Sequence, residues 1–319
     1  MVMNSIVEAL LGSNRIGISF HASPDGDSIG SSLALLQALI KLNKDAYILC
    51  DDKAPEVYSF LPYINSINNA LNNLKEDTDC VVVLDCGSYD RISADLKAAT
   101  QKYTLINIDH HLTNQFYGQI NLVQTDASAV GEIIYELIGE LGIELDENIA
   151  ICLYTSIVTD TGGFKYSNTT SKTHNIVGDI IKTGINFSEV HRLVFENKKY
   201  NRIKLYGSVI NSMYLTSKGR ICVMKLTSEL LNAAGNKVSD TSDIISIGME
   251  IDTVEVAILL KEVSEGIKIS LRSKSIVDVR KIAEIFGGGG HTRASGLSID
   301  KSIDETEKLI VSLIEKELL

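Results

Sequence analysis

Histidine and aspartate side chains follow an apolar run near the start of the chain. The run is RIGISF, at residues 15–20, and the polar side chains His21, Asp25 and Asp27 come after it in the segment HASPDGDS. Residues 28–40 then place apolar side chains near a 3.6-residue period, which predicts a helix. The polar side chains therefore lie where a strand passes into a helix, at the edge where open parallel sheets bind their ligands.

Further polar clusters follow apolar runs later in the chain. They end the segments CVVVLD, TLINIDHH and SIVTD, and their members are Asp85, Asp109, His110, His111 and Asp160. In a parallel sheet the ends of such runs meet along one edge, so we expect the clusters to converge. Taken singly, each aspartate could instead favour a helix N-terminus or a turn. Taken together, so many carboxylates in one cleft would repel one another unless cations neutralised them.

The donor atoms of these clusters indicate which metals could bind. Carboxylate and imidazole groups suit Mn²⁺, Mg²⁺, Zn²⁺ or Fe²⁺, and the absence of cysteine from the clusters disfavours zinc. The five cysteines form no CxxC pair, which favours reduced thiols in the cytoplasm. We therefore predict a hydrolytic site for two divalent cations, which can clamp phosphoryl oxygens and activate water for in-line displacement.

These motifs, in this order, resemble the four motifs of the DHH phosphoesterase family. The matching segments are HASPDGD, the strand end at Asp85, the DHH of residues 109–111 and the segment around Asp160. Arg91, six residues after Asp85, also fits the second motif and joins the catalytic candidates. The resemblance implies a phosphoesterase that depends on two Mn²⁺ ions, with Mg²⁺ or Co²⁺ as alternatives.

The resemblance also divides the roles among the polar residues. It implies that one ion is held by His21, Asp25 and Asp85, and that the other is held by Asp27, Asp85, His110 and Asp160. His111 would contact the phosphate or protonate the leaving oxygen. Asp109 would orient a neighbouring histidine or the backbone. The alternative is that Asp109 has a purely structural role.

A glycine-rich segment, FGGGGHTRASG at residues 286–296, is the second strong signal. Consecutive glycines let backbone N–H groups approach an anion, and a helix expected after them would add its positive end. The segment resembles the DHH-associated C-terminal domain, which implies binding of the nucleotide part of the substrate across a cleft from the metals. The residues expected to bind a second phosphate or a base are Arg272, Ser273, Gly287, Gly288, Gly289, Gly290, His291 and Arg293.

The elements that must position these residues follow from the apolar patterning. Up to about residue 190, short apolar runs alternate with helical ones, which predicts a parallel sheet with helices on both faces. A charged helical stretch and then a second set of strand-like runs predict a linker helix and a smaller α/β domain. The expected domains are a catalytic DHH domain at 1–190, a linker helix at 191–205 and a substrate-binding domain at 206–319.

The net charge and the hydropathy of the sequence limit which molecules the chain is expected to bind. A net charge of −11 argues against a surface that grips long nucleic acid. The chain has no apolar run of 18 residues and its first residues lack a signal-peptide pattern, so we expect no membrane contact and a cytoplasmic location. The resemblance to the compact nanoRNase and pAp phosphatase subgroup implies hydrolysis of short oligoribonucleotides such as pApA to mononucleotides, and of pAp to AMP.

Three alternatives stay open at this point. The first is a cyclic di-AMP phosphodiesterase, which would use the same motifs on a neighbouring substrate. The second is a manganese-dependent inorganic pyrophosphatase, against which the GGGGH segment argues because that family carries a different C-terminal domain. The third is a nucleotide-binding regulator without catalysis, against which the complete set of ligand positions argues. A homodimer is compatible with the chain, but no segment indicates its interface.

Overall fold

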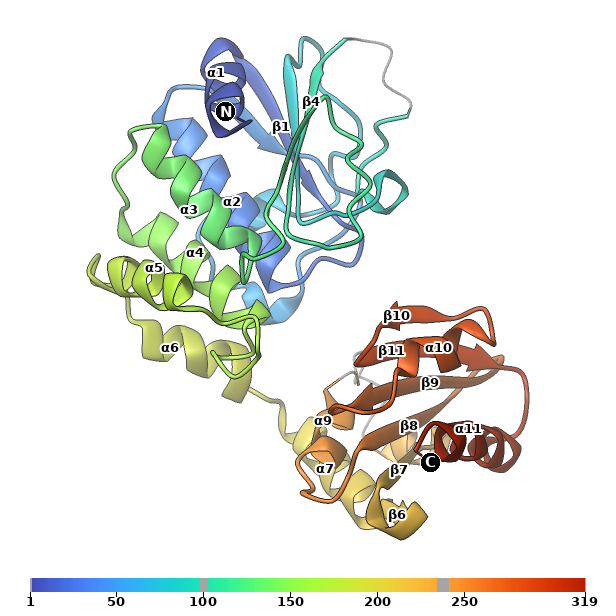
Figure 1. Ribbon diagram of the computed structural model, residues 1–319. Helices are drawn as coiled ribbons and strands as arrows, with labels where there is room; N and C mark the ends of the chain where they lie inside the picture. The colour runs from blue at the N-terminus through green and yellow to red at the C-terminus, as the bar shows by residue number, and fades with distance from the viewer. Residues whose placement is uncertain (1, 98–101, 234–240, 242, 319) are drawn as a thin grey trace. The chain divides into compact units, whose positions relative to one another are not determined.

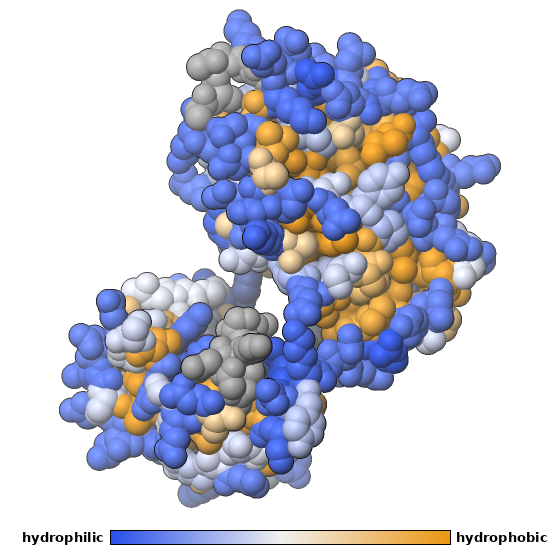
Figure 2. Space-filling model, turned by 180° about the vertical axis from the view of Figure 1, so that it is seen from behind, coloured by the Kyte–Doolittle hydropathy of each residue, from blue (hydrophilic) through white to orange (hydrophobic). Residues whose placement is uncertain are grey.

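The computed structural model describes residues 2–97, 102–233, 241 and 243–318, and it divides the chain into two compact units. The first unit is Met1–Asn197 and the second is Lys198–Leu319 (Figure 1). In the view of Figure 2, hydrophilic residues cover much of each unit and hydrophobic residues reach the surface in separate areas. No helix among the described residues is both long and apolar enough to cross a bilayer.

A five-stranded parallel sheet forms the centre of the first unit. Its order is β2-β1-β3-β4-β5, and every neighbouring pair is parallel. The three inner strands and the outer strand β2, which lies in the run DAYILC, were predicted, whereas the outer strand β5 was not. The carboxyl ends of the three inner strands therefore lie side by side. The bounds are β1 Arg15–Phe20, β2 Asp45–Ile48, β3 Cys80–Leu84, β4 Thr104–Asp109 and β5 Ile120–Val123.

The long helices of the first unit gather on one face of this sheet (Figure 1). Helix α2 is buried from Gly26 to Leu39 because it packs against the sheet, α3 and α4. A Cβ at Gly30 would come within 2.4 Å of the Cys152 carbonyl oxygen, so glycine allows the close approach of α2 and α4. The bounds are α1 Val2–Gly12, α2 Gly26–Lys41, α3 Val130–Glu140, α4 Glu147–Asp160, α5 Ser171–Ile181 and α6 Phe187–His191.

The expectation of helices on both faces is wrong for the described residues. The opposite face, which includes Tyr47, Val81 and Val83, is covered by side chains from irregular segments between residues 49 and 117. That stretch contains two prolines and many Asn and Asp residues, which disfavour helix interiors. Apart from β3 and β4, its described residues form only the short 3₁₀ turns η1 Glu56–Tyr58, η2 Ile64–Ser66 and η3 Tyr89–Arg91 as regular structure.

The second unit is built on a six-stranded mixed sheet of order β10-β11-β9-β8-β7-β6, in which only β7 and β8 are parallel. One apolar core lies between the sheet and helices α10 and α11, and another lies beneath α7 and α9. The strands are β6 Tyr214–Thr216, β7 Ile221–Leu226, β8 Val256–Val263, β9 Gly266–Ser273, β10 Gly289–His291 and β11 Ala294–Ile299. The helices are α7 Tyr200–Ser212, α8 Ser228–Ala233, α9 Ile244–Met249, α10 Val279–Glu284 and α11 Ile303–Glu317.

The stretch expected as one linker helix, 191–205, is not continuous. It contains the end of α6, the five-residue π-helical segment η4 Arg192–Glu196, a non-helical break and the start of α7. The break coincides with the boundary between the two units, after Asn197. Helix α7 therefore belongs to the second unit and packs against β7.

Candidate metal centre

The inner strands and two helices bring the predicted polar residues to one edge of the first sheet. His21 follows β1, Asp85 follows β3, and His110 follows β4. Asp27 lies in the first turn of α2, and Asp160 is the last residue of α4. The strand ends converge as predicted because β1, β3 and β4 are neighbours in a parallel sheet.

Asp160 does not follow a strand, contrary to expectation. The apolar segment before it belongs to helix α4, which packs against α2 and so carries its carboxyl end to the sheet edge. A carboxylate in this position faces the negative end of the helix dipole. Burial raises the pKa of Asp160 to about 6, with His110 opposing the rise and Asp85 and Asp25 adding to it.

One group of possible metal ligands surrounds His21. Its Nε2 lies 3.4 Å from Oδ2 of Asp85 and 3.7 Å from Oδ1 of Asp25. Burial lowers the pKa of His21, but the two carboxylates outweigh that effect and raise it to about 11. Asp25 also caps α2, because its carboxylate accepts hydrogen bonds from the backbone N–H groups of Asp27 and Ser28. These three side chains lie close enough together to hold one metal ion.

A second group surrounds His110. Its Nε2 lies 3.8 Å from Oδ2 of Asp27, 3.6 Å from Oδ1 of Asp85 and 3.8 Å from Oδ2 of Asp160. Its Nδ1 lies 3.1 Å from the carbonyl oxygen of Ala127, so Nδ1–H donates there. Nε2 is thereby left to face the carboxylates, as a metal-binding imidazole requires. Asp27, His110 and Asp160 could hold one ion.

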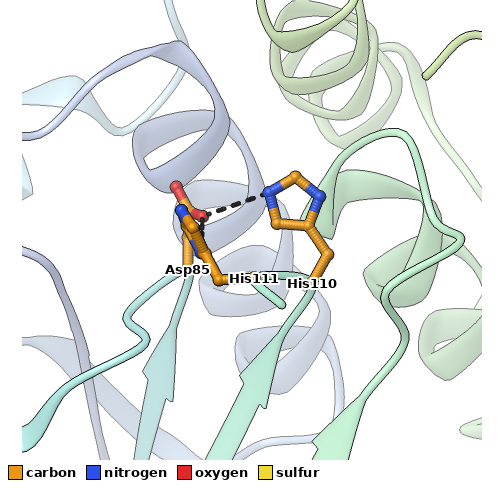
Figure 3. Close-up of side chains that lie close together, drawn as sticks. All are labelled: Asp85, His110 and His111. Carbon is orange, nitrogen blue, oxygen red and sulfur yellow. Dashed lines mark ion pairs between the residues drawn. The ribbon is translucent and has the colours of Figure 1, made fainter. Parts of the chain in front are cut away.

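Asp85 stands between the two groups, with one carboxylate oxygen toward each. Figure 3 shows its carboxylate facing His110 and His111. Its backbone has φ +52°, a left-handed conformation that few residues other than glycine adopt. Its N–H still donates to the Ile108 carbonyl oxygen over 3.0 Å. Such strain, on the order of 1 kcal/mol, is typical of residues held for function.

The buried carboxylates concentrate negative charge at this edge of the sheet. Asp27 is 1% exposed and Asp85 2% exposed. Burial first, and then neighbouring carboxylates, raise the pKa of both. Asp27 is also fixed by hydrogen bonds from the Val130 N–H (2.7 Å), the Gly131 N–H (3.2 Å) and the Ser156 hydroxyl (2.5 Å). A preformed set of oxygen and imidazole donors with this charge fits divalent cations.

His111 and Asp109 form a separate pair beside the two groups. Nδ1 of His111 lies 2.7 Å from Oδ1 of Asp109 and 3.6 Å from Oδ1 of Asp85. Burial raises the pKa of Asp109, but the hydrogen bond and charge of His111, together with the hydrogen bonds from Asn114 and the His110 backbone, outweigh it, and the pKa is lowered. The hydrogen bond between His111 and Asp109 also raises the pKa of His111. His111 also lies within reach of an ion shared with Asp85 and His110.

Asn114 is a site residue that the sequence patterns missed. Its Nδ2 donates to Oδ2 of Asp109 over 2.5 Å and to Oδ1 of Asn107 over 2.8 Å. Asn114 therefore fixes the Asp109 carboxylate, which in turn orients the His111 ring. Asn114 lies only three residues after His111, but an uncharged amide in a loop does not by itself indicate a catalytic or metal-binding role.

Arg91 contacts the first motif through its backbone. Its carbonyl oxygen accepts a hydrogen bond from the Ala22 N–H over 2.7 Å, and Ile92 forms an isolated bridge with His21. The side chain of Arg91 is exposed. The loop that carries Arg91 therefore braces the segment that contains the metal-ligand candidates.

The glycine segment of the second unit forms a hairpin and not a loop before a helix. Gly289–His291 is strand β10, which pairs antiparallel with β11 through the turn Thr292–Arg293. The expected helix dipole is therefore absent after the glycines. Residues 294–299 alternate in burial and pair with β9, which is strand behaviour. A Cβ at Gly288 would lie 2.4 Å from the Gly296 carbonyl oxygen, so close backbone contact also requires glycine here.

The other predicted binding residues gather at the same edge of the second sheet. Arg272 and Ser273 end β9, and Arg272 pairs with Ala294 of β11, which also pairs with His291. Ser273 Oγ and Arg293 Nη1 both donate to the Val277 carbonyl oxygen, over 2.7 Å and 2.9 Å. The structure thus brings these residues together around the hairpin.

The chain is similar to known protein families and to curated proteins over most of its length. The model of the DHH family N-terminal domain matches residues 15–157, and that of the DHHA1 domain matches 219–318. The chain is 31% identical over 305 residues to the bifunctional oligoribonuclease and PAP phosphatase NrnA of Thermus thermophilus, covering 95% of this chain and 90% of the relative. It is 30% identical over 296 residues to the Bacillus subtilis protein of the same name, covering 92% and 91%.

A solved structure shares the whole fold. It is an exopolyphosphatase-related protein from Bacteroides fragilis, with a TM-score of 0.91 and 27% identity. The match covers 99% of this chain and 96% of that one. Both units of the chain therefore occur together in a known structure.

Proposed function

The chain belongs to the DHH family, and on that premise we propose that it hydrolyses short oligoribonucleotides to mononucleotides and pAp to AMP. The observation that carries the proposal is the placement of Asp85 between two groups that could each hold a cation. Relatives named as oligoribonucleases and PAP phosphatases, at 29–31% identity over most of the chain, support the choice of substrates.

Two divalent cations complete the proposed site, with Mn²⁺ favoured over Mg²⁺ or Co²⁺. His21, Asp25 and Asp85 would hold one, and Asp27 and His110 would hold the other together with Asp85 and Asp160. When bound, the ions would neutralise the phosphoryl oxygens and activate the attacking water. The mixture of carboxylate and imidazole donors suits Mn²⁺.

His111 is the proposed general acid. Its Nδ1 is held by Asp109, and its pKa is raised by that hydrogen bond, which favours a proton on Nε2 at neutral pH. That proton would pass from Nε2 to the leaving oxygen of the phosphoester. Asp109, itself fixed by Asn114, orients the ring throughout. Arg91 is the proposed cationic contact of this unit to the phosphate.

The hairpin edge of the second unit is the proposed binding site for the nucleotide part of the substrate. The glycines at 287–290 would let a phosphate approach the backbone closely. The N–H groups of Gly287 and Gly288 already donate to the carbonyl oxygens of Glu284 and Ala283, so the contact would be made at the exposed strand Gly289–His291. Arg272 and Arg293 would add charge, and His291 would add a hydrogen bond to a phosphate or base. Ser273, whose hydroxyl donates to the Val277 carbonyl oxygen, would support this edge from within. The net charge of −11 disfavours long polyanions, so short substrates fit best.

A substrate panel tests this proposal. Purified protein would be assayed with pAp, pApA, five-nucleotide RNA, cyclic di-AMP, pyrophosphate and polyphosphate, each with Mn²⁺, Mg²⁺ or Co²⁺. We expect turnover of pAp, pApA and the short RNA, and loss of all three activities in Asp160→Ala. Turnover of pyrophosphate or polyphosphate alone, or of none of the panel, would contradict the proposal.

A further inference from the structure

Residues 127–131, where the loop after β5 passes into helix α3, contact two members of the His110 group. The carbonyl oxygen of Ala127 accepts from Nδ1 of His110, and the N–H groups of Val130 and Gly131 donate to the carboxylate of Asp27. The third member, Asp160, is the last residue of α4, a helix that packs against α3. A side chain links the backbone of Asp160 to residues 127–131.

Asn168 makes that connection. Its Nδ2 donates to the Ser128 carbonyl oxygen over 2.9 Å and to the Asp160 carbonyl oxygen over 3.1 Å. Because both partners are carbonyl oxygens, only the NH₂ end of the amide can face them. Its other end, Oδ1, is buried and has no hydrogen-bond partner. The contribution of Asn168 to this part of the fold thus comes from two donated hydrogen bonds.

Glu132 holds the same segment from the other side. It is fully buried in the first turn of α3, and its Oε1 accepts from the Ser128 hydroxyl over 2.5 Å and from the Thr173 hydroxyl over 2.6 Å. Thr173 lies in the first turn of α5, five residues after Asn168. Ser128 is therefore held through both its carbonyl oxygen and its hydroxyl. Because Asn168 donates to Ser128 and to Asp160, loss of its amide would free the end of α4 to shift relative to Ser128.

We propose that Asn168 is a positioning residue for the cation held by Asp27, His110 and Asp160, and that it leaves the cation at His21 and Asp25 unaffected. The inference rests on the two-ion site proposed above. Metal ligands must be held to within about 0.5 Å, and loss of a group that orients them typically costs about 10- to 100-fold in metal affinity. No described contact of Asn168 reaches His21 or Asp25.

Two variants of Asn168 test the proposal by metal binding in the absence of substrate. Asn168→Asp keeps the shape, removes the donor and places a carboxylate oxygen against the two carbonyl oxygens, so it is the more disruptive of the two variants. Asn168→Ala removes the donor without adding a carboxylate that could bind a cation itself. Mn²⁺ binding would be followed by calorimetry and by electron paramagnetic resonance, which distinguishes a coupled pair of ions from single ones.

For both variants we expect one Mn²⁺ to bind about 10- to 100-fold more weakly, the other to bind as in the wild type, and the coupled signal to appear only at high Mn²⁺. At saturating Mn²⁺ we expect kcat to return to near the wild-type value. The matched control is Asn121→Asp, which removes an amide donor to the Gly118 carbonyl oxygen in the same unit. It should bind both ions normally.

Binding of both ions with wild-type affinity in the two variants would overturn the proposal. Equal weakening of both ions, or the same loss in Asn121→Asp, would overturn it too, because the effect would then be general destabilisation. Binding of fewer than two Mn²⁺ ions by the wild type would instead overturn the two-ion site of the proposed function, and this inference with it.

Discussion

The metal edge of the first unit and the hairpin edge of the second unit hold their candidate residues in opposite ways. Asp27, Asp85 and Asp109 are almost fully buried, and each has its carboxylate fixed by named partners. The hairpin residues Gly289–His291 are exposed, and the contacts that shape them are mostly between backbones. One edge is therefore rigid and charged, and the other is open and built from main chain.

This difference indicates a division of labour. Groups that must meet a reacting atom in one geometry need a buried, hydrogen-bonded surround. Groups that bind substrate without reacting can lie on an exposed hairpin supported by a sheet. If this division is correct, changes at the first edge will remove turnover, and changes at the second will weaken binding while turnover of the bound substrate continues.

The largest expected effect is that of Asp85→Asn. Asparagine tolerates the left-handed backbone at this position and keeps the shape, but it removes the charge shared by both candidate ion sites. We expect kcat for pApA with Mn²⁺ to fall by on the order of 10³-fold or more. The control is Asp90→Ala, which removes an exposed carboxylate paired with Lys97 and should leave kcat unchanged. A rate within tenfold of the wild type in Asp85→Asn would remove the distinction between the two edges.

A smaller effect is expected at the hairpin, from His291→Ala. Loss of one hydrogen bond to a charged substrate group should raise KM for pApA about tenfold and leave kcat within about twofold. Lys281→Ala, at an exposed position on α10, serves as the control and should change neither constant. A fall in kcat with unchanged KM would instead place His291 among the groups that act on the reacting phosphate.

The last expected effect concerns the pH dependence of the metal-free fold. The neighbouring carboxylates raise the pKa of His21 to about 11 and that of His110 to about 9, although burial opposes them. A histidine whose folded pKa is raised stabilises the fold below its unfolded pKa near 6.5, and this stabilisation is lost as pH rises through the folded value. The free energy of unfolding of metal-free protein should therefore fall between pH 6.5 and 9, by about 3 kcal/mol or more.

Urea unfolding of chelator-treated protein at pH 6.5 and 9 measures this change. Mn²⁺ should stabilise the protein more at pH 9, because its ligands must be deprotonated before it binds. His110→Gln should reduce the pH dependence without abolishing it, since His21 still titrates. A metal-free fold that became more stable toward pH 9 would contradict the ion pairing described at the first edge.

The first edge was largely predictable from the sequence because its signals are local. Apolar runs of five or six residues mark β1, β3 and β4, and parallel topology then brings His21, Asp85 and His110 together. Asp160 was expected after a strand because the short apolar run before it does not distinguish a strand from a helix. The run is in fact the end of the fourteen-residue helix α4, which carries Asp160 to the sheet edge. Asn114 and Asn168 were missed because their roles exist only through distant partners.

The hairpin was harder to predict because glycine carries no side-chain pattern. Four glycines are compatible with a loop, a helix start or a strand, and the choice here follows from the pairing of β10 and β11. The available signal was the alternation of Leu297 and Ile299 with small or polar residues in 294–299, which the structure shows as alternating burial. The grouping of Arg272, Ser273, His291 and Arg293 did not depend on that choice, because β9 and β11 are neighbours in the sheet.

The most direct measurement is anomalous diffraction at the manganese edge from crystals grown with Mn²⁺. The account predicts two peaks, one among His21, Asp25 and Asp85 and one among Asp27, His110 and Asp160, with Asp85 beside both. A single peak, or peaks elsewhere in the chain, would contradict it.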